Sequence, residues 1–181
     1  MPRLERSRAA LLVIDIQEKL VPAMEAELKA RLLGSARLWG QAAKLLGLPV
    51  VMTEQYPKGL GPTIPDVRAA FSEVTPRSKL CFDALGDPAN AEMLGSCAQV
   101  VVMGMETHIC VFQTVRSLAQ RGKQVHVLRD AVASRTHENY QVGLELCRAA
   151  GAIISSTEAA LFDLLGEAGT DEFRAISKLL R

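Results

Sequence analysis

Several features that mark common classes of protein are absent from this sequence. Aromatic residues make up only 4% of it, and no basic run is interleaved with them, so nothing indicates nucleic-acid binding. The longest apolar runs have the length of a strand, which is too short for a transmembrane helix or a signal-peptide core. With a formal net charge of +1, the sequence is typical of a cytoplasmic globular protein that has neither nucleic acid nor a membrane as a partner.

The motifs of several catalytic classes are absent as well. The cysteines (Cys81, Cys97, Cys110 and Cys147) form no CxxC pair, which argues against zinc-ribbon and thioredoxin chemistry. The three histidines lack the HxxxH spacing of a zinc site. The GxSxG elbow of α/β-hydrolases, the GxGxxG dinucleotide fingerprint and the Walker A loop are also missing. We therefore expect no metal and no cofactor.

Apolar runs of strand length alternate with amphipathic helical patterns along the whole chain. Strands are predicted at residues 9–14, 49–53, 100–103, 124–130 and 152–155, with 74–79 as a loop or an edge strand. Helices are predicted at residues 27–46, 66–71, 87–98, 110–121, 138–149, 156–165 and 171–181. Strands that are apolar throughout are typical of parallel sheets covered on both faces. The sequence therefore predicts one α/β domain over residues 1–181, a three-layer α/β/α sandwich around a mostly parallel, Rossmann-like sheet of five or six strands.

The segment from Gly104 to Val111 joins an apolar strand to a helix, and it contains Cys110. Cys110 would lie in the first turn of that helix, at the C-terminal edge of the sheet, where open α/β sheets bind ligands. The partial positive charge of a helix N-terminus favours a thiolate, so we expect a nucleophile whose thiol pKa lies below the free value of about 8.5. The alternative is a buried structural cysteine, since free cysteine is common in protein cores.

Charged residues end two other predicted strands. Asp15 comes directly after the first strand, and Lys79 ends the possible edge strand. A carboxylate beside a thiol can take its proton, and a lysine beside both would hold the carboxylate ionised and stabilise the thiolate. Alternatively, Asp15 is a turn or cap residue and Lys79 is a solvated surface charge, because spacing alone does not bring the three residues together.

Loops at the same edge of the sheet are candidates for ligand contacts. The loop 54–62 is rich in proline and glycine, and we expect Tyr56 at the pocket mouth, where it would select a small, planar or short-chain acyl substrate. The loop 131–137 places His137 at that edge, whereas His126 lies within a strand. His108 precedes Cys110 by two residues, so the two side chains would point to different sides of a helix and are not expected to pair.

Three separated segments resemble the isochorismatase-like cysteine hydrolases. They are residues 12–17 (LVIDIQ), 77–79 (RSK) and 104–111 (GMETHICV), and residues 130–135 match the next strand end of that family. The stretch 53–61 (TEQYPKGLG) looks most like the isochorismatase domain-containing subgroup. The resemblance covers about residues 8 to 166 and implies the α/β/α fold of this family.

The resemblance also implies roles for individual residues. It places a catalytic triad on Asp15, Lys79 and Cys110, and an oxyanion hole on the backbone N–H groups of Glu106 and Cys110. It further implies a cis peptide bond between Met105 and Glu106. We assign substrate contacts to residues beside the triad or in the loop after the second strand, namely Gln17, Gln55, Tyr56, Met105, Thr107 and His108.

Two departures from the wider superfamily restrict the reaction. Nicotinamidases carry a metal-binding Asp and His set after the second strand, where this chain reads Glu54 to Pro57 and has no histidine. Isochorismatases proper lack a nucleophilic cysteine, whereas this chain has Cys110. The resemblance therefore favours a metal-independent cysteine hydrolase that acts on a small amide-type or related acyl substrate through a thioester. The rivals are a catalytically silent binding or scaffold protein that keeps the fold, and a redox sensor, for which no resolving cysteine is indicated.

Assembly is the last expectation from the sequence. The predicted helix 171–181 has an apolar side formed by Phe173, Ile176 and Leu180. Together with the habit of the family, this side predicts a homo-oligomer, a dimer or larger.

Overall fold

The structure is a computed structural model that describes residues 3–180. Its centre is a six-stranded sheet in the order β3-β2-β1-β4-β5-β6, in which neighbouring strands pair in parallel. The strands are β1 (Ala9–Ile14), β2 (Val50–Gln55), β3 (Arg77–Lys79), β4 (Gln99–Met105), β5 (Gln124–Ala133) and β6 (Ile153–Ser155). The predicted α/β/α architecture is thereby confirmed, with six strands.

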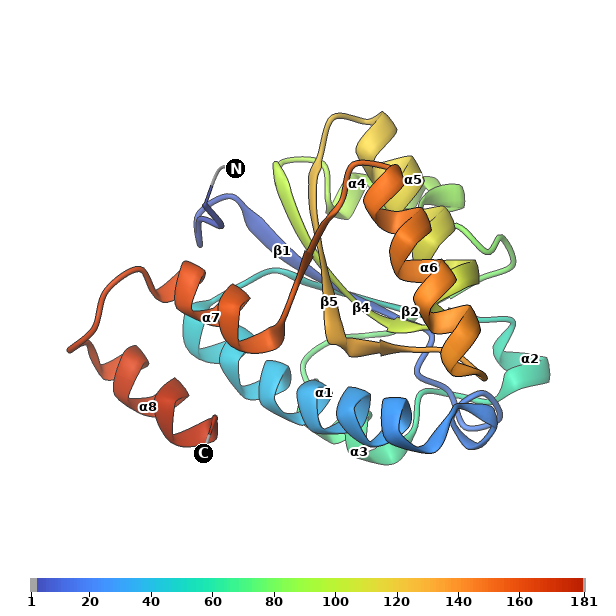
Figure 1. Cartoon of the computed structure of the whole chain (residues 1–181), viewed down its shortest axis with the longest axis horizontal. Coiled ribbons are helices and arrows are strands. Elements are labelled where there is room, and N and C mark those ends of the chain that lie inside the picture. The colour runs from blue at the N-terminus through green and yellow to red at the C-terminus, as the bar shows by residue number, and fades with distance from the viewer. Residues whose placement is uncertain (1–2, 181) are drawn as a thin grey trace.

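Helices cover both faces of the sheet. They are α1 (Ala26–Leu46), α2 (Pro57–Leu60), α3 (Pro65–Ala70), α4 (Pro88–Met93), α5 (Phe112–Gln120), α6 (His137–Ala149), α7 (Thr157–Leu165) and α8 (Asp171–Leu179). Short turns η1 (Val21–Ala23) and η2 (Ala84–Gly86) are 3₁₀-helical, and η3 (Thr107–Val111) is a turn of π-helix. In Figure 1, α1, α3, α7 and α8 lie on one side of the sheet and α4, α5 and α6 on the other.

The two central strands, β1 and β4, form the middle of the core, and every residue of both is buried. Gly104 is required where they approach each other, because its φ is +124° and a Cβ would lie 2.0 Å from the carbonyl oxygen of Ile14. The register of β4 against β5 shifts between Val102 and Gly104. Such an irregularity bends a strand and re-aims the residues after it, and here those residues lead into η3.

Some predicted bounds differ from the observed ones. β5 continues to Ala133 instead of ending at residue 130, because Val132 and Ala133 pair with the last two residues of β4. The expected loop 131–137 is therefore reduced to residues 134–136. The helix expected from residue 87 to 98 ends at Met93, and the helix after β4 begins with η3 rather than with a regular α-helical turn.

The C-terminal helix α8 packs within its own chain. Ile176 is fully buried, and the ring of Phe173 meets the edge of Phe162 at a centroid distance of 6.2 Å. The predicted extension to Arg181 lies outside the described residues. The apolar side of α8 is therefore used at least in part within its own chain, and the homo-oligomer stays a prediction. Between residues 3 and 180 there is also no helix with the length and apolar content needed to cross a bilayer.

Candidate active site

The topological switch point of the sheet lies between β1 and β4. From β1 the order proceeds outward through β2 and β3, and from β4 it proceeds the other way through β5 and β6. Connections that diverge in this way leave a crevice at the carboxyl ends of the strands, where α/β proteins bind ligands. Asp15 directly follows β1 and Cys110 lies in η3 directly after β4, so both residues lie at this point.

Asp15 and Lys79 form a buried ion pair. The ammonium of Lys79 lies 2.6 Å from Oδ2 of Asp15, and the two side chains are 1% and 0% exposed. Thr53 donates its hydroxyl to Oδ1 of Asp15 (2.7 Å), and Lys79 also donates to Oε1 of Gln55 (2.7 Å). The φ of Asp15 is +54°, a left-handed conformation that is uncommon for non-glycine residues and is often found at functional sites.

Burial raises the pKa of the Asp15 carboxyl above its ordinary value of 3.8. The charge of Lys79 and hydrogen bonds from Lys79, Thr53 and Cys110 lower that pKa, but they do not outweigh burial. A carboxylate with a raised pKa is a stronger base than an exposed one, because the efficiency of proton transfer follows basicity.

Cys110 lies beside this pair. Its side chain is only 6% exposed and hydrogen-bonds to Asp15. Burial and the negative charge of Asp15 raise the pKa of the Cys110 thiol to about 12, and the charge of Lys79 offsets this only in part. The expectation of a lowered thiol pKa is therefore wrong for the free protein, because burial and a neighbouring carboxylate outweigh the favourable position near a helix start.

We expect the alkylation of Cys110 by iodoacetamide to accelerate about tenfold per pH unit up to about pH 10 without a plateau, because only the thiolate reacts. Cys81 is exposed and would also be alkylated, so the measurement uses a Cys81→Ser background and peptide mass spectrometry. Cys97 and Cys147 are buried. A plateau below about pH 8.5 would instead reveal a thiolate stabilised in the free protein.

The turn that carries Cys110 is closed by its own backbone. The peptide bond between Met105 and Glu106 is cis, at the position that the resemblance implied. The carbonyl of Glu106 accepts the N–H groups of Ile109 (3.0 Å) and Val111 (3.2 Å), the residues on either side of Cys110. The backbone around the thiol is thus held in one tight conformation.

Two neighbours hold this turn from outside. Gly143 lets α6 approach η3 closely, because a Cβ at this position would lie 2.7 Å from the backbone N of His108. Arg135 donates its backbone N–H (3.1 Å) and its Nε (3.0 Å) to the carboxylate of Glu106. Any side chain at position 143 would therefore displace the turn, and Arg135 neutralises the carboxylate beside it.

Two of the residues predicted to contact substrate, Gln17 and Gln55, have side chains that are hydrogen-bonded to other groups of the protein. The amide of Gln17 is fully buried and bonds to the backbone N–H (2.7 Å) and carbonyl (2.9 Å) of Gln55 and to the carbonyl of Gly61 (2.7 Å). The prediction of a substrate contact is therefore wrong for Gln17, which fixes the start of the loop after β2. Gln55 accepts from Lys79 and donates to the carbonyl of Leu80 (2.8 Å), so it orients Lys79.

The other predicted contacts differ in their exposure. Tyr56 is 51% exposed, as a residue at a pocket mouth would be. Met105 is fully buried in the core, which argues against a side-chain contact, and Thr107 is equally buried, with a hydroxyl that has no hydrogen-bond partner among the described residues. His108 is partly exposed, its Nδ1 lies 3.1 Å from the hydroxyl of Ser134, and burial lowers its pKa.

Other candidate residues lie in structural positions. Asp130 accepts the N–H of Thr157 (2.8 Å) at the start of α7. His126 is buried within β5, and His137 begins α6 with its ring 5.6 Å from that of Tyr140. In the part of the chain that the structure describes, no three His, Cys, Asp or Glu side chains are grouped so that they could hold a metal ion.

Sequence reasoning missed two threonines at the site. Thr53 ends the second predicted strand, and its pairing with Ile14 of the first strand brings it beside Asp15. Thr114 donates its hydroxyl to the carbonyl of Cys110 (2.7 Å). Its position four residues after Cys110 is the spacing at which helical threonines bond back to a carbonyl, so this signal was present in the sequence.

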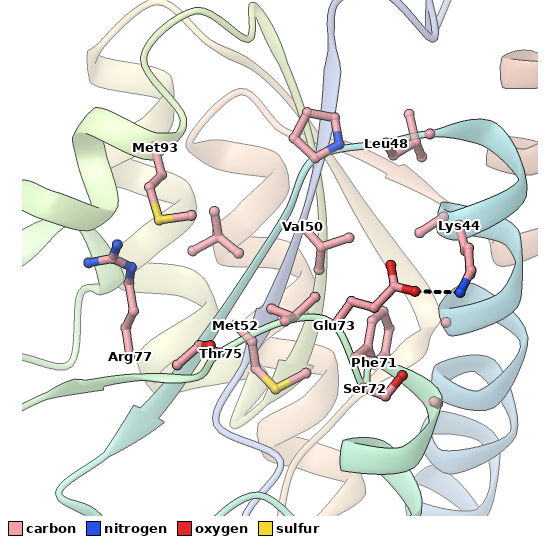
Figure 2. Close-up of a pocket in the computed structure, with 17 residues that line it drawn as sticks. Lys44, Leu48, Val50, Met52, Phe71, Ser72, Glu73, Thr75, Arg77 and Met93 are labelled. Carbon is pink, nitrogen blue, oxygen red and sulfur yellow. Dashed lines mark hydrogen bonds and ion pairs between the residues drawn. The ribbon is translucent and has the colours of Figure 1, made fainter.

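A hollow of about 910 Å³ lies elsewhere, between α1, the α3–β3 connection and the edge of β2 (Figure 2). Its lining includes Val50, Met52 and Phe71, and the ion pair of Lys44 with Glu73 stands at one side. None of the candidate site residues lines it. The site at the switch point is separate from this hollow.

The protein is therefore an α/β sandwich with a parallel sheet and an enclosed site that contains a thiol. In that site a buried acid–lysine pair lies beside a cysteine. The isochorismatase domain family matches residues 9–159, and the chain belongs to this family. The resemblance drawn from the three sequence segments is thereby confirmed. Membership supports a hydrolase-like function.

Individual relatives extend the match to most of the chain. Isochorismatase domain-containing protein 2 of Danio rerio is 34% identical over 180 residues, which are 98% of this chain and 89% of the relative. The secreted isochorismatase effector Isc1 of Phytophthora sojae is 40% identical over 146 residues, covering 77% of this chain and 70% of its own. The solved structure of the MAR1 ribonuclease of Caenorhabditis elegans has a TM-score of 0.93 and 33% identity, with 99% and 92% of the two chains covered.

Proposed function

We propose that this protein is a metal-independent cysteine hydrolase that cleaves a small amide-type or related acyl substrate through a thioester. The observation that carries the proposal is the convergence of Asp15, Lys79 and Cys110, which come from three separated segments and meet in an enclosed site. Such a cluster has the parts that nucleophilic catalysis needs: a thiol, a base beside it and a cation that stabilises both ionised forms.

In the first step, Asp15 accepts the thiol proton as the sulfur of Cys110 bonds to the carbonyl carbon. Because the pKa of the thiol is raised to about 12, the proton leaves during the attack rather than before it. The raised pKa of Asp15 favours this transfer, and the charge of Lys79 acts on both Asp15 and Cys110. The carbonyl electron pair moves to oxygen, where we assign the backbone N–H groups of Glu106 and Cys110 as donors; one such donor typically contributes about 10²–10³ in rate.

In the second half of the cycle, Asp15 gives its proton to the leaving amine as the C–N bond breaks, and a thioester remains on Cys110. Water then attacks the thioester and Asp15 takes a proton from it. When the C–S bond breaks, that proton returns to the sulfur. The same carboxyl group therefore alternates between base and acid, which requires only that it reach both the thiol and the leaving group.

Metal independence is proposed from the possible metal ligands at the end of β2. The place of the metal-binding residues of nicotinamidases is occupied by side chains with other partners. Glu54 accepts the backbone N–H (2.7 Å) and hydroxyl (2.8 Å) of Thr63, and Gln55 bonds to Lys79. Both side chains are thus engaged with other groups of the protein.

Assembly, location and domain organisation are also proposed. Leu80 (77% exposed) and Phe82 (53% exposed) follow Lys79, and large exposed apolar side chains favour association, so we propose a homo-oligomer. All four cysteines are free, which supports a reducing, cytoplasmic location, although the relative from Phytophthora sojae is named as secreted. We propose a single domain over the whole chain.

The proposal is tested with a panel of small amides, esters and short RNA, the last because the relative from Caenorhabditis elegans is named as a ribonuclease. Turnover of an amide or ester should occur with the wild type and disappear with Cys110→Ala. The raised thiol pKa also suits the alternative of a catalytically silent binding protein. That alternative gains if the panel gives no turnover that depends on Cys110. Cleavage of RNA alone would overturn the proposed acyl chemistry in favour of a nuclease.

A further inference from the structure

The loop between β3 and α4 wraps around the ammonium of Lys79. Lys79 donates to the backbone carbonyls of Cys81 (3.3 Å) and Phe82 (3.1 Å), while the side chains of Leu80 and Phe82 turn outward to solvent. The backbone of this loop, and not its side chains, therefore holds the cation. The position of the loop, together with Asp15 and Gln55, therefore determines where the ammonium lies.

Two hydroxyl groups of α5 hold this loop in place through hydrogen bonds. Thr114, which is fully buried, accepts the backbone N–H of Ala84 (2.9 Å) and donates to the carbonyl of Cys110 (2.7 Å). Ser117 donates to the carboxylate of Asp83 (2.5 Å). The two ties differ in one respect: Ser117 bonds only to the loop, whereas Thr114 bonds both to the loop and to the residue that carries the thiol.

We propose that Thr114 is a positioning residue, which sets the separation of Lys79 from Cys110 by bonding to the loop that holds one and to the carbonyl of the other. The interaction of two charges falls with distance, and a misplacement of 1 Å at a reacting centre can cost about 10²-fold in rate. The importance of this separation for turnover rests on the proposed function. The effect of this separation on the pKa of the Cys110 thiol does not depend on the proposed function.

The test compares the alkylation of Cys110 in Thr114→Val and in the wild type, both in a Cys81→Ser background. Valine keeps the shape of threonine without its hydroxyl, so the loop should withdraw Lys79 and raise the pKa of the thiol. We expect alkylation at a fixed alkaline pH to slow by roughly three- to tenfold, and Thr114→Ser to restore it. Simple loosening of the fold would have the opposite effect, because it would expose a buried thiol.

Thr157→Val is the matched control, since it removes another buried threonine hydroxyl, one that accepts from Trp39 (3.3 Å) far along the chain from Cys110. On any substrate found in the panel, Thr114→Val should lower kcat roughly 10- to 100-fold with little change in KM, and Thr157→Val should not. Thr114→Ala serves as a second variant if Thr114→Val fails to fold.

Alkylation in Thr114→Val or Thr114→Ala that equals or exceeds that of Thr157→Val would overturn the proposal. So would a failure of Thr114→Ser to restore the wild-type rate. If the panel yields no turnover that depends on Cys110, the proposed function fails, but the alkylation comparison still decides the role of Thr114.

Discussion

Replacing Asp15 by asparagine is expected to lower turnover by about 10²–10⁴-fold, the range that a positioned general base typically contributes. Asparagine keeps the size of the side chain and tolerates the left-handed φ of +54° at this position. It cannot accept the thiol proton, so the attack of Cys110 on the substrate would lose its base.

The same substitution should make Cys110 more reactive toward iodoacetamide. Asp15 raises the pKa of the thiol through its charge and its hydrogen bond, whereas Lys79 lowers it. Without the carboxylate, burial still raises the pKa of the thiol, but the neighbouring ammonium lowers it unopposed by a negative charge, and the thiolate becomes the counter-charge of Lys79. Loss of turnover together with faster alkylation is the signature of a base that acts on the thiol.

Both measurements are made well below the unfolding temperature, because the variant leaves the Lys79 ammonium buried without its carboxylate. Glu25→Gln is a matched control: it also neutralises a carboxylate, one that caps α1 through the N–H groups of Glu27 (3.1 Å) and Leu28 (2.9 Å). Unchanged turnover in Asp15→Asn would remove Asp15 from the mechanism. Slower alkylation in that variant would contradict the electrostatic account of the thiol.

The architecture was predictable from sequence because its signals are local. The run from Ala9 to Ile14 is apolar throughout and is buried on both faces in the structure, where strands β2 and β4 flank it. The first helix was predicted to end at residue 46 and does so, and Gly47 follows it in the left-handed conformation, with φ of +61°. Periodicity and end signals of this kind depend only on neighbours along the chain.

The extent of β5 and the role of Lys79 were not predictable in the same way. β5 continues to Ala133 because residues across the sheet pair with it after a register shift in β4. Lys79 has no local signal that separates it from a surface lysine, and its burial follows from the carboxylate of Asp15 and the carbonyls of the next loop. The resemblance to a family supplied the triad that spacing alone left open.

The pKa of the Cys110 thiol is a second property that could not be predicted from local sequence. The position of Cys110 near a helix start predicted a stabilised thiolate, and that feature is present. Burial and the adjacent Asp15 carboxylate reverse the direction, because both penalise a second negative charge in an enclosed site. Electrostatics of this kind depends on distances between segments that are far apart in sequence.

Replacing Lys79 by methionine is expected to destabilise the protein by about 3–5 kcal/mol at neutral pH, because it leaves the Asp15 carboxylate buried without its counter-charge. Lys79 is the main influence that lowers the pKa of Asp15, so that pKa should rise further in the variant. Urea unfolding followed at several pH values measures both the loss and its pH dependence.

The loss of stability in Lys79→Met should shrink as the pH falls. A carboxyl group whose pKa is higher in the folded than in the unfolded state contributes stability that is present below the unfolded pKa, about 3.9, and is lost as the pH rises through the folded pKa. Acidification therefore protonates Asp15 in the folded variant and removes the uncompensated charge. The double variant Asp15→Asn/Lys79→Met has no charge at either position, so it should be more stable than Lys79→Met at neutral pH and should lack this pH dependence. A loss that is equal at every pH, and that simply adds to the loss in Asp15→Asn, would mean that the two side chains are not coupled as a buried pair.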